Sequence, residues 1–163
     1  MRSNRNWVEE ICSDPDDFSI ILDAYDFFNS EYERLRAEMS VEKLRGTRAA
    51  DLAVKIPSYT DQIQSHWSEI MAISDHLDIL ITAAKQKARK KYIENYNREL
   101  GSHQVKDYAE AEPEVLDIRK IVLRIELIKN KMEGLSKSGE RLHFQVGNLI
   151  RLKEAGLDEM CIN

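Results

Sequence analysis

At 163 residues the chain has the length of a single domain, with enough side chains to bury a modest core. Charged residues make up 33% of it, whereas glycine (6) and proline (3) are scarce, and this composition favours long helices over a sheet with many turns. The formal net charge of −5 would by itself argue against a nucleic-acid partner.

The charge is distributed unevenly along the chain. Residues 1–84 hold 8 basic and 16 acidic side chains, net −8, whereas residues 85–163 hold 16 basic and 13 acidic ones, net +3. A difference in sign between two halves indicates an acidic region joined to one that can bind a polyanion.

Several classes of protein are not expected from this sequence. No apolar run is as long as a membrane span, and the N-terminal residues, which include Arg2 and Arg5, lack the apolar stretch of a signal peptide. Cys12 and Cys161 lie near opposite ends and have no metal-binding spacing, so we interpret them as reduced, incidental thiols. We therefore expect a soluble cytoplasmic protein that makes no membrane contact.

The first strong helical pattern lies near the N-terminus. Asp14-Pro15-Asp16-Asp17 is typical of a helix start, because Ser13 or Asp14 can cap the first turn and Pro15 suits it. The pattern continues to about Met39, with apolar side chains every three or four residues: Phe18, Ile21, Leu22, Tyr25, Phe28, Tyr32 and Leu35. This aromatic face either packs on the domain's own core or binds a partner, and the pattern leaves both open.

A shorter helical pattern over residues 41–54 follows, and Lys55-Ile56-Pro57-Ser58 is expected to end it because proline disrupts a helix interior. We therefore divide the chain into an acidic, aromatic helical segment, 1–56, and a second region, 57–163.

The second region begins with a very long predicted helix. Ser58 or Thr60 can cap it, and it runs from about residue 59 to about residue 98. Its apolar seam has nearly heptad spacing, which favours side-by-side packing on another helix: Ile63, Trp67, Ile70, Ile73, Leu77 and Leu80.

A polar linker from Gly101 leads to the last long helix, which Pro113 opens. Its seam contains Val115, Ile118, Val122, Ile125, Ile128, Met132 and Leu135. The predicted fold is therefore all-α, with a long antiparallel helical hairpin made by residues 59–98 and 113–155.

A basic strip lies where the apolar pattern of the 59–98 helix runs out. We define this basic strip as Lys85, Lys87, Arg89, Lys90, Lys91, Tyr92, Tyr96 and Arg98. Closely spaced cations can follow the phosphates of a nucleic acid, and tyrosines offer faces on which bases stack. The other interpretation is a solvated helix face, because lysine and arginine are good helix formers.

The sequence contains no recognisable catalytic motif. The four histidines are scattered, and no metal-binding motif or glycine-rich phosphate loop is present. We interpret Glu110, Glu112 and Glu114 as a solvated linker and helix cap. Neither an enzyme nor a metal or cofactor is expected.

Several landmarks between about Pro57 and Gly156 resemble UvsY, the recombination mediator of T-even-type tailed phages. They are an early tryptophan in a long amphipathic helix (Trp67), Lys87-Ala88-Arg89 followed by Tyr92, an acidic linker, Val115-Leu116, Ser138-Gly139 and Glu154-Ala155-Gly156. The resemblance covers about 100 of the 163 residues and depends on the order of these landmarks.

This resemblance implies a helical homo-oligomer, arranged as a ring in the host-cell cytoplasm, that binds single-stranded DNA. Such proteins help to remove the phage single-strand-binding protein and load a UvsX/RecA-type recombinase. The family's Lys-Ala-Arg step corresponds to Lys87 and Arg89. The candidate subunit contacts are Leu142, Val146, Leu149 and Leu152, for which a core within the chain is the alternative. The alternative function is a helical adaptor or inhibitor that acts through protein contacts.

Overall fold

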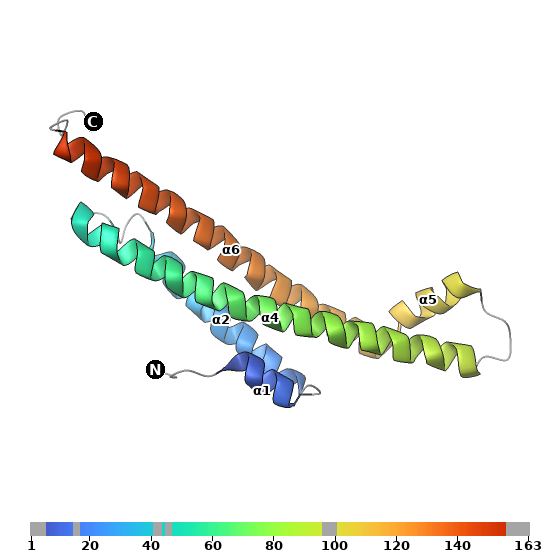
Figure 1. Ribbon diagram of the computed structural model, residues 1–163. Coiled ribbons are helices and arrows are strands. Elements are labelled where there is room, and N and C mark those ends of the chain that lie inside the picture. Colours follow the sequence, from blue (N-terminus) through green and yellow to red (C-terminus); the bar gives the residue numbers. More distant parts are fainter. Residues whose placement is uncertain (1–5, 15–16, 41–43, 45–46, 96–100, 156–163) are drawn as a thin grey trace. The chain divides into compact units, whose positions relative to one another are not determined.

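The computed structural model describes residues 6–14, 17–40, 44, 47–95 and 101–155, and these residues form helices and their connections, with no strand (Figure 1). The all-helical class is therefore confirmed. No helix in the described ranges is long and apolar enough to cross a membrane.

The N-terminal region contains two helices where one was predicted. α1 (Trp7–Ser13) is capped by Asn6, whose side-chain oxygen accepts a hydrogen bond from the Glu9 amide at 3.2 Å. α2 (Phe18–Glu38) begins later than predicted, after Asp17, whose carboxylate accepts a hydrogen bond from the Ser19 amide at 2.9 Å. Asp14 ends α1 instead of capping α2.

α4 (Ala49–Asn95) contains Pro57, so the predicted break at residues 55–58 is wrong. Proline in a helix interior costs about 3 kcal/mol, but Ile56 and Ile63 on either side of it are both 0% exposed, and their burial offsets that cost. The boundary expected between residues 56 and 57 lies inside this helix, and a functional division there stays a prediction.

The segment predicted as a linker is partly helical. α5 (Ser102–Glu110) buries Val105 and Ala109, which are four residues apart on one face. α6 (Pro113–Glu154) starts at the predicted proline and continues through Gly134 and Gly139.

The described chain divides into two compact units. Unit 1 combines residues up to Tyr25 with Glu69–Leu127, and unit 2 combines Asp26–Ser68 with residues from Ile128 onward. The core of unit 1 includes Trp7, Ile11, Ile21, Ile70, Ile73, Leu77, Val115, Ile118 and Ile125. The core of unit 2 includes Phe28, Leu35, Ile56, Ile63, Ile128, Met132 and Val146. Most of the predicted apolar seams are therefore buried.

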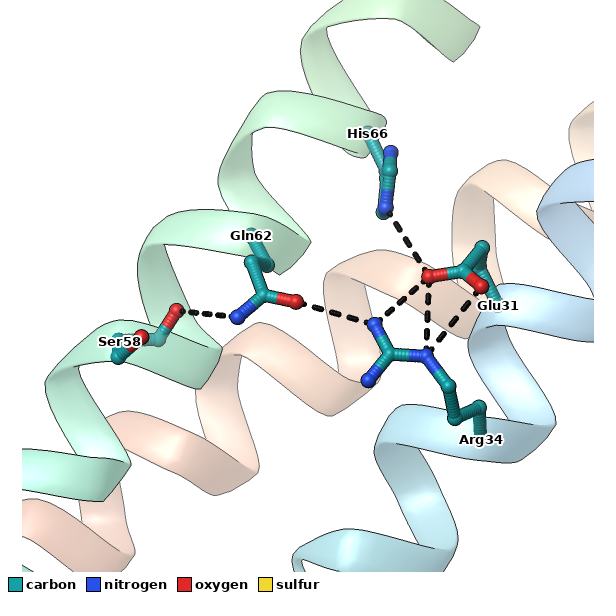
Figure 2. A network of polar contacts seen from close by, with 5 residues as sticks. All are labelled: Glu31, Arg34, Ser58, Gln62 and His66. Atoms are coloured by element: carbon teal, nitrogen blue, oxygen red, sulfur yellow. Dashed lines mark hydrogen bonds and ion pairs between the residues drawn. The ribbon is translucent and has the colours of Figure 1, made fainter. Parts of the chain in front are cut away.

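In unit 2 a polar network joins α2 to α4 (Figure 2). Arg34 donates hydrogen bonds to the Glu31 carboxylate at 2.7 Å and to the Gln62 side-chain oxygen at 3.0 Å. His66 Nε2 lies 3.6 Å from the same carboxylate of Glu31. The hydrogen bond from Arg34 is the main reason why the pKa of Glu31 lies below its usual value.

At Gly139, in unit 2, α6 closely approaches α4 and Met39, the residue that follows α2. A Cβ atom at this position would lie 2.9 Å from Thr60 Oγ1 and 3.0 Å from Met39 Cε. Only a residue without a side chain fits here unless a neighbour moves.

Candidate nucleic-acid interface

Most of the basic strip lies on the last turns of α4, in unit 1. Lys85, Lys87, Arg89, Lys90, Lys91 and Tyr92 are helical, whereas Tyr96 and Arg98 lie outside the described residues. The strip is helical because Ala84 and Ala88, each 6% exposed, hold this part of α4 against the core.

The strip does not form a single row of cations. Residues two positions apart on an α-helix point about 200° apart, so Lys87 and Arg89 lie on different sides of the buried Ala88. Residues four apart share a side, and this groups Lys87 with Lys91 and Lys85 with Arg89.

The side with Lys87 and Lys91 contacts the start of α6. Lys87 Nζ lies 3.0 Å from the Glu114 carboxylate, and Lys91 Nζ lies 2.8 Å from that of Glu112. The hydrogen bond between Lys91 and Glu112 raises the pKa of Lys91 and lowers the pKa of Glu112. A polyanion must compete with these carboxylates for the two lysines.

The remaining two lysines of the strip have looser ion pairs. Lys85 Nζ lies 3.8 Å from Glu110 on α5, and Lys90 Nζ lies 3.8 Å from Glu94 on α4 itself. The interpretation of Glu110, Glu112 and Glu114 as a solvated linker and cap therefore missed their contacts with the strip. These three acids lie beside the lysines because of the register in which α5 and α6 pack against α4. No local pattern in the sequence predicts this register.

The side with Arg89 faces α5 across a surface hollow of about 510 Å³. Arg89 and Lys106 both line it, with Ser102, Val105 and Ile93, and no acidic side chain of a described residue lines it. Neither Arg89 nor Lys106 has an ion pair with a described residue. Lys106 was missed by the sequence analysis because it lies on the helix that was taken for a linker.

Tyr92 lies beside a second tyrosine. Its ring centroid is 5.5 Å from that of Tyr108, with the planes tilted by 31°, and Lys91 Nζ lies 5.7 Å from the Tyr92 ring. A hydrogen bond from Tyr92 also helps to lower the pKa of Glu112. Tyr108 is 43% exposed, so part of its side chain is open to solvent.

The predicted subunit contacts on α6 differ in exposure. Val146 is only 3% exposed and belongs to the core of unit 2, so the alternative of a core within the chain holds for it. Leu149 and Leu152 are 50% and 43% exposed, and Leu142 is half-buried. Leu149 and Leu152 are thus the members of this set with most surface open to another subunit.

Within the described part of the chain, no three histidine, cysteine, aspartate or glutamate side chains are grouped in a way that could hold a metal ion. In comparisons with known proteins, no protein-family model, no curated protein and no solved structure matches this chain.

Proposed function

We propose that the protein is a recombination mediator that binds single-stranded DNA and promotes the loading of a UvsX/RecA-type recombinase onto DNA covered by phage single-strand-binding protein. The observation that carries the proposal is the hollow with Arg89 and Lys106, two cations with no acidic neighbour among the described residues of its lining. The landmarks that resemble UvsY support it independently, because Arg89 belongs to the Lys-Ala-Arg step.

The mechanism is electrostatic. A phosphate that enters the hollow gains Arg89 and Lys106 without first breaking an ion pair with a described residue. Lys87 and Lys91 also bind DNA when its phosphates replace the carboxylates of Glu114 and Glu112. In this replacement each lysine exchanges one anionic partner for another. Each new lysine or arginine contact releases a counterion and adds about 0.7 to the slope of log affinity against log salt concentration.

Assembly is the second part of the proposal. A single protomer has few cations for DNA and binds weakly, whereas a homo-oligomeric ring multiplies them through effective concentration. The long antiparallel hairpin of α4 and α6 supplies the scaffold in this proposal, with exposed Leu149 and Leu152 in subunit contacts. The protein would act in the host-cell cytoplasm and catalyse no reaction itself.

The test is fluorescence anisotropy of a labelled oligo-dT of about 30 nucleotides, titrated with the full chain at several salt concentrations. The double variant Arg89→Ala, Lys106→Ala is expected to bind more weakly and to lower the salt slope by about 1.4, the value for two lost contacts. The control is Arg119→Ala, Arg124→Ala, which removes two exposed cations of α6 in the same unit. Equal losses in both double variants would reject the hollow as the site.

One observation favours the alternative, a helical adaptor or inhibitor. Four lysines of the basic strip already have carboxylate partners, so they do not require a polyanion. Oligo-dT that fails to bind even at low salt would reject the mediator and leave the adaptor as the better function.

A further inference from the structure

A second surface feature lies in unit 2, away from the basic strip in sequence. It is a groove of about 590 Å³ between the end of α2 and the middle of α6. Its cations are Arg36, Lys131 and Arg141, and its large aliphatic side chains are Met39, Leu135 and Leu142. We call this feature the α2/α6 groove.

Among the described residues, three cations and no acidic side chain line the groove, so their charges make it positive. Arg141 is exposed and has no ion pair with a described residue. Arg36 lies 3.9 Å from Glu33, but both side chains are more than half exposed, and such a pair contributes little. Lys131 is held by neutral groups, the Asn29 oxygen at 3.1 Å and the Tyr32 ring at 5.1 Å. All three charges therefore attract an anionic partner.

The apolar side chains of the groove continue along α6. Leu135, Leu142, Leu149 and Leu152 are separated by seven, seven and three residues, the spacing of one helical seam. Leu135 is 9% exposed, whereas Leu149 is 50% exposed and Leu152 is 43% exposed. The same seam is thus buried at Leu135 and exposed at Leu149 and Leu152. An exposed apolar seam of this spacing suits a second helix that packs alongside α6.

The charges select among possible occupants. If a second copy met this surface with the same surface, the two sets of three cations would be brought together, and like charges oppose such a contact. A nucleic acid would match the charge but would gain little from leucine and methionine, because bases stack on open aromatic faces, and Lys131 already lies near the Tyr32 ring. An acidic helix with an apolar stripe matches both the cations and the leucines.

We infer that the α2/α6 groove is a docking site for an acidic amphipathic helix of a partner protein. The partner helix places apolar side chains at positions i, i+3 or i+4, and i+7 on the groove's own Met39, Leu135 and Leu142, and leaves Leu149 and Leu152 to the proposed subunit contacts. Its carboxylates contact Arg36, Lys131 and Arg141. This inference does not depend on DNA binding, because the groove and the basic strip share no residue.

The probe is a labelled peptide of about 21 residues, roughly 30 Å long as a helix, with leucine at heptad positions a and d and glutamate on the flanking positions. A matched peptide carries lysine in place of every glutamate. The full chain is titrated into each peptide, and we expect it to bind only the acidic one, with an affinity that falls as salt rises.

The test variant is Arg36→Glu, Arg141→Glu. Both side chains are exposed, so the fold is expected to survive, and circular dichroism checks this. We expect about a tenfold or greater loss of affinity for the acidic peptide, because two attractions become repulsions. The control, Arg119→Glu, Arg124→Glu, makes the same charge change in unit 1 and should bind the peptide much as the unaltered chain does.

Four results of the peptide and oligo-dT titrations would overturn the inference. They are no binding of the acidic peptide, equal binding of the lysine peptide, equal losses in the test and control variants, and a test variant that loses oligo-dT affinity while it keeps the peptide. The last result would assign the groove to nucleic acid. A change in oligomer size without a change in peptide affinity would assign it to a second copy of the chain and would also overturn the inference.

Discussion

Among the described residues, Glu112 is the acidic residue that would most directly oppose the proposed DNA binding by the basic strip. Its side chain is 16% exposed, it lies 2.8 Å from Lys91, and its lowered pKa keeps it charged well into the acidic range. Glu114 holds Lys87 in the same way, but in an exposed pair. Both lysines therefore have a competitor for phosphate within the chain.

We expect Glu112→Gln, Glu114→Gln to bind oligo-dT more tightly than the unaltered chain, by roughly two- to tenfold, because two competing charges are gone while both lysines remain. Anisotropy at constant salt measures this. Glu126→Gln, an exposed change on α6 in the same unit, controls for the general loss of negative charge. Unchanged or weaker binding relative to that control would mean that phosphates do not replace these carboxylates.

In unit 2, Glu31 is also a carboxylate with a lowered pKa, and its ion pair stabilises the fold. Its pKa is lower in the folded state than the usual 4.5, chiefly through the Arg34 hydrogen bond. A carboxylate with a depressed pKa stabilises the fold above its unfolded pKa, and this contribution is lost as the pH falls through the folded pKa.

We therefore expect Glu31→Gln to lower the free energy of unfolding by about 1 kcal/mol at pH 7. The difference from the unaltered chain should begin to shrink as the pH falls below 4.5, where the unfolded state takes up a proton, and should be lost as the pH falls through the lower pKa of the folded state. Urea unfolding at pH 7 and at about pH 3.5 measures both values. A difference that stays constant between the two pH values would contradict an electrostatic role.

At the scale of elements, periodicity predicted α6 and most of α2 and α4 because their apolar seams are long and regular. It failed at Pro57, where burial of Ile56 and Ile63 outweighs a local preference. It also failed at α5, which offers only Val105 and Ala109 as a signal. A short pattern becomes a helix when another element covers it, and the sequence alone does not say which element that is.

The candidate site was likewise predicted only in part. The lysines of the basic strip were found because they are neighbours in sequence. Their partners Glu112 and Glu114 lie 21 and 27 residues away from Lys91 and Lys87, and Lys106 lies on the unforeseen helix. Contacts between elements depend on register, which single-chain patterns do not fix.

The two glycines within α6 allow a matched test of its packing. A Cβ at Gly134 would meet nothing within 4 Å, so Gly134→Ala should stabilise the protein by about 1 kcal/mol through helix propensity. Gly139→Ala should destabilise it by about 1 to 2 kcal/mol, because Thr60 Oγ1 lies 2.9 Å from the new Cβ and is held by a hydrogen bond to the Ile56 carbonyl.

Urea unfolding of the two alanine variants measures both effects, and each variant serves as the control for the other. Equal stabilisation by the two changes would mean that α6 does not pack closely on α4 at Gly139.

At the scale of the whole molecule, the proposed ring predicts that substitutions in its subunit contacts reduce the number of subunits. We expect Leu149→Ser, Leu152→Ser to reduce the oligomer size, and the affinity for oligo-dT to fall with it because effective concentration is lost. Leu123→Ser, at a position that is 61% exposed in unit 1, is the control. Analytical ultracentrifugation gives the size, and an unaltered chain that is monomeric at every concentration would reject the ring.

The boundaries of the two units all fall inside helices. The chain passes from one unit to the other at residues 25–26 in α2, 68–69 in α4 and 127–128 in α6. A protease needs an extended, accessible segment, and helical backbone at each crossing offers none without local unfolding. Limited digestion should therefore not separate the two units by cuts at these three crossings. Gene truncation is equally unable to isolate a unit, since each is built from two separate stretches of chain.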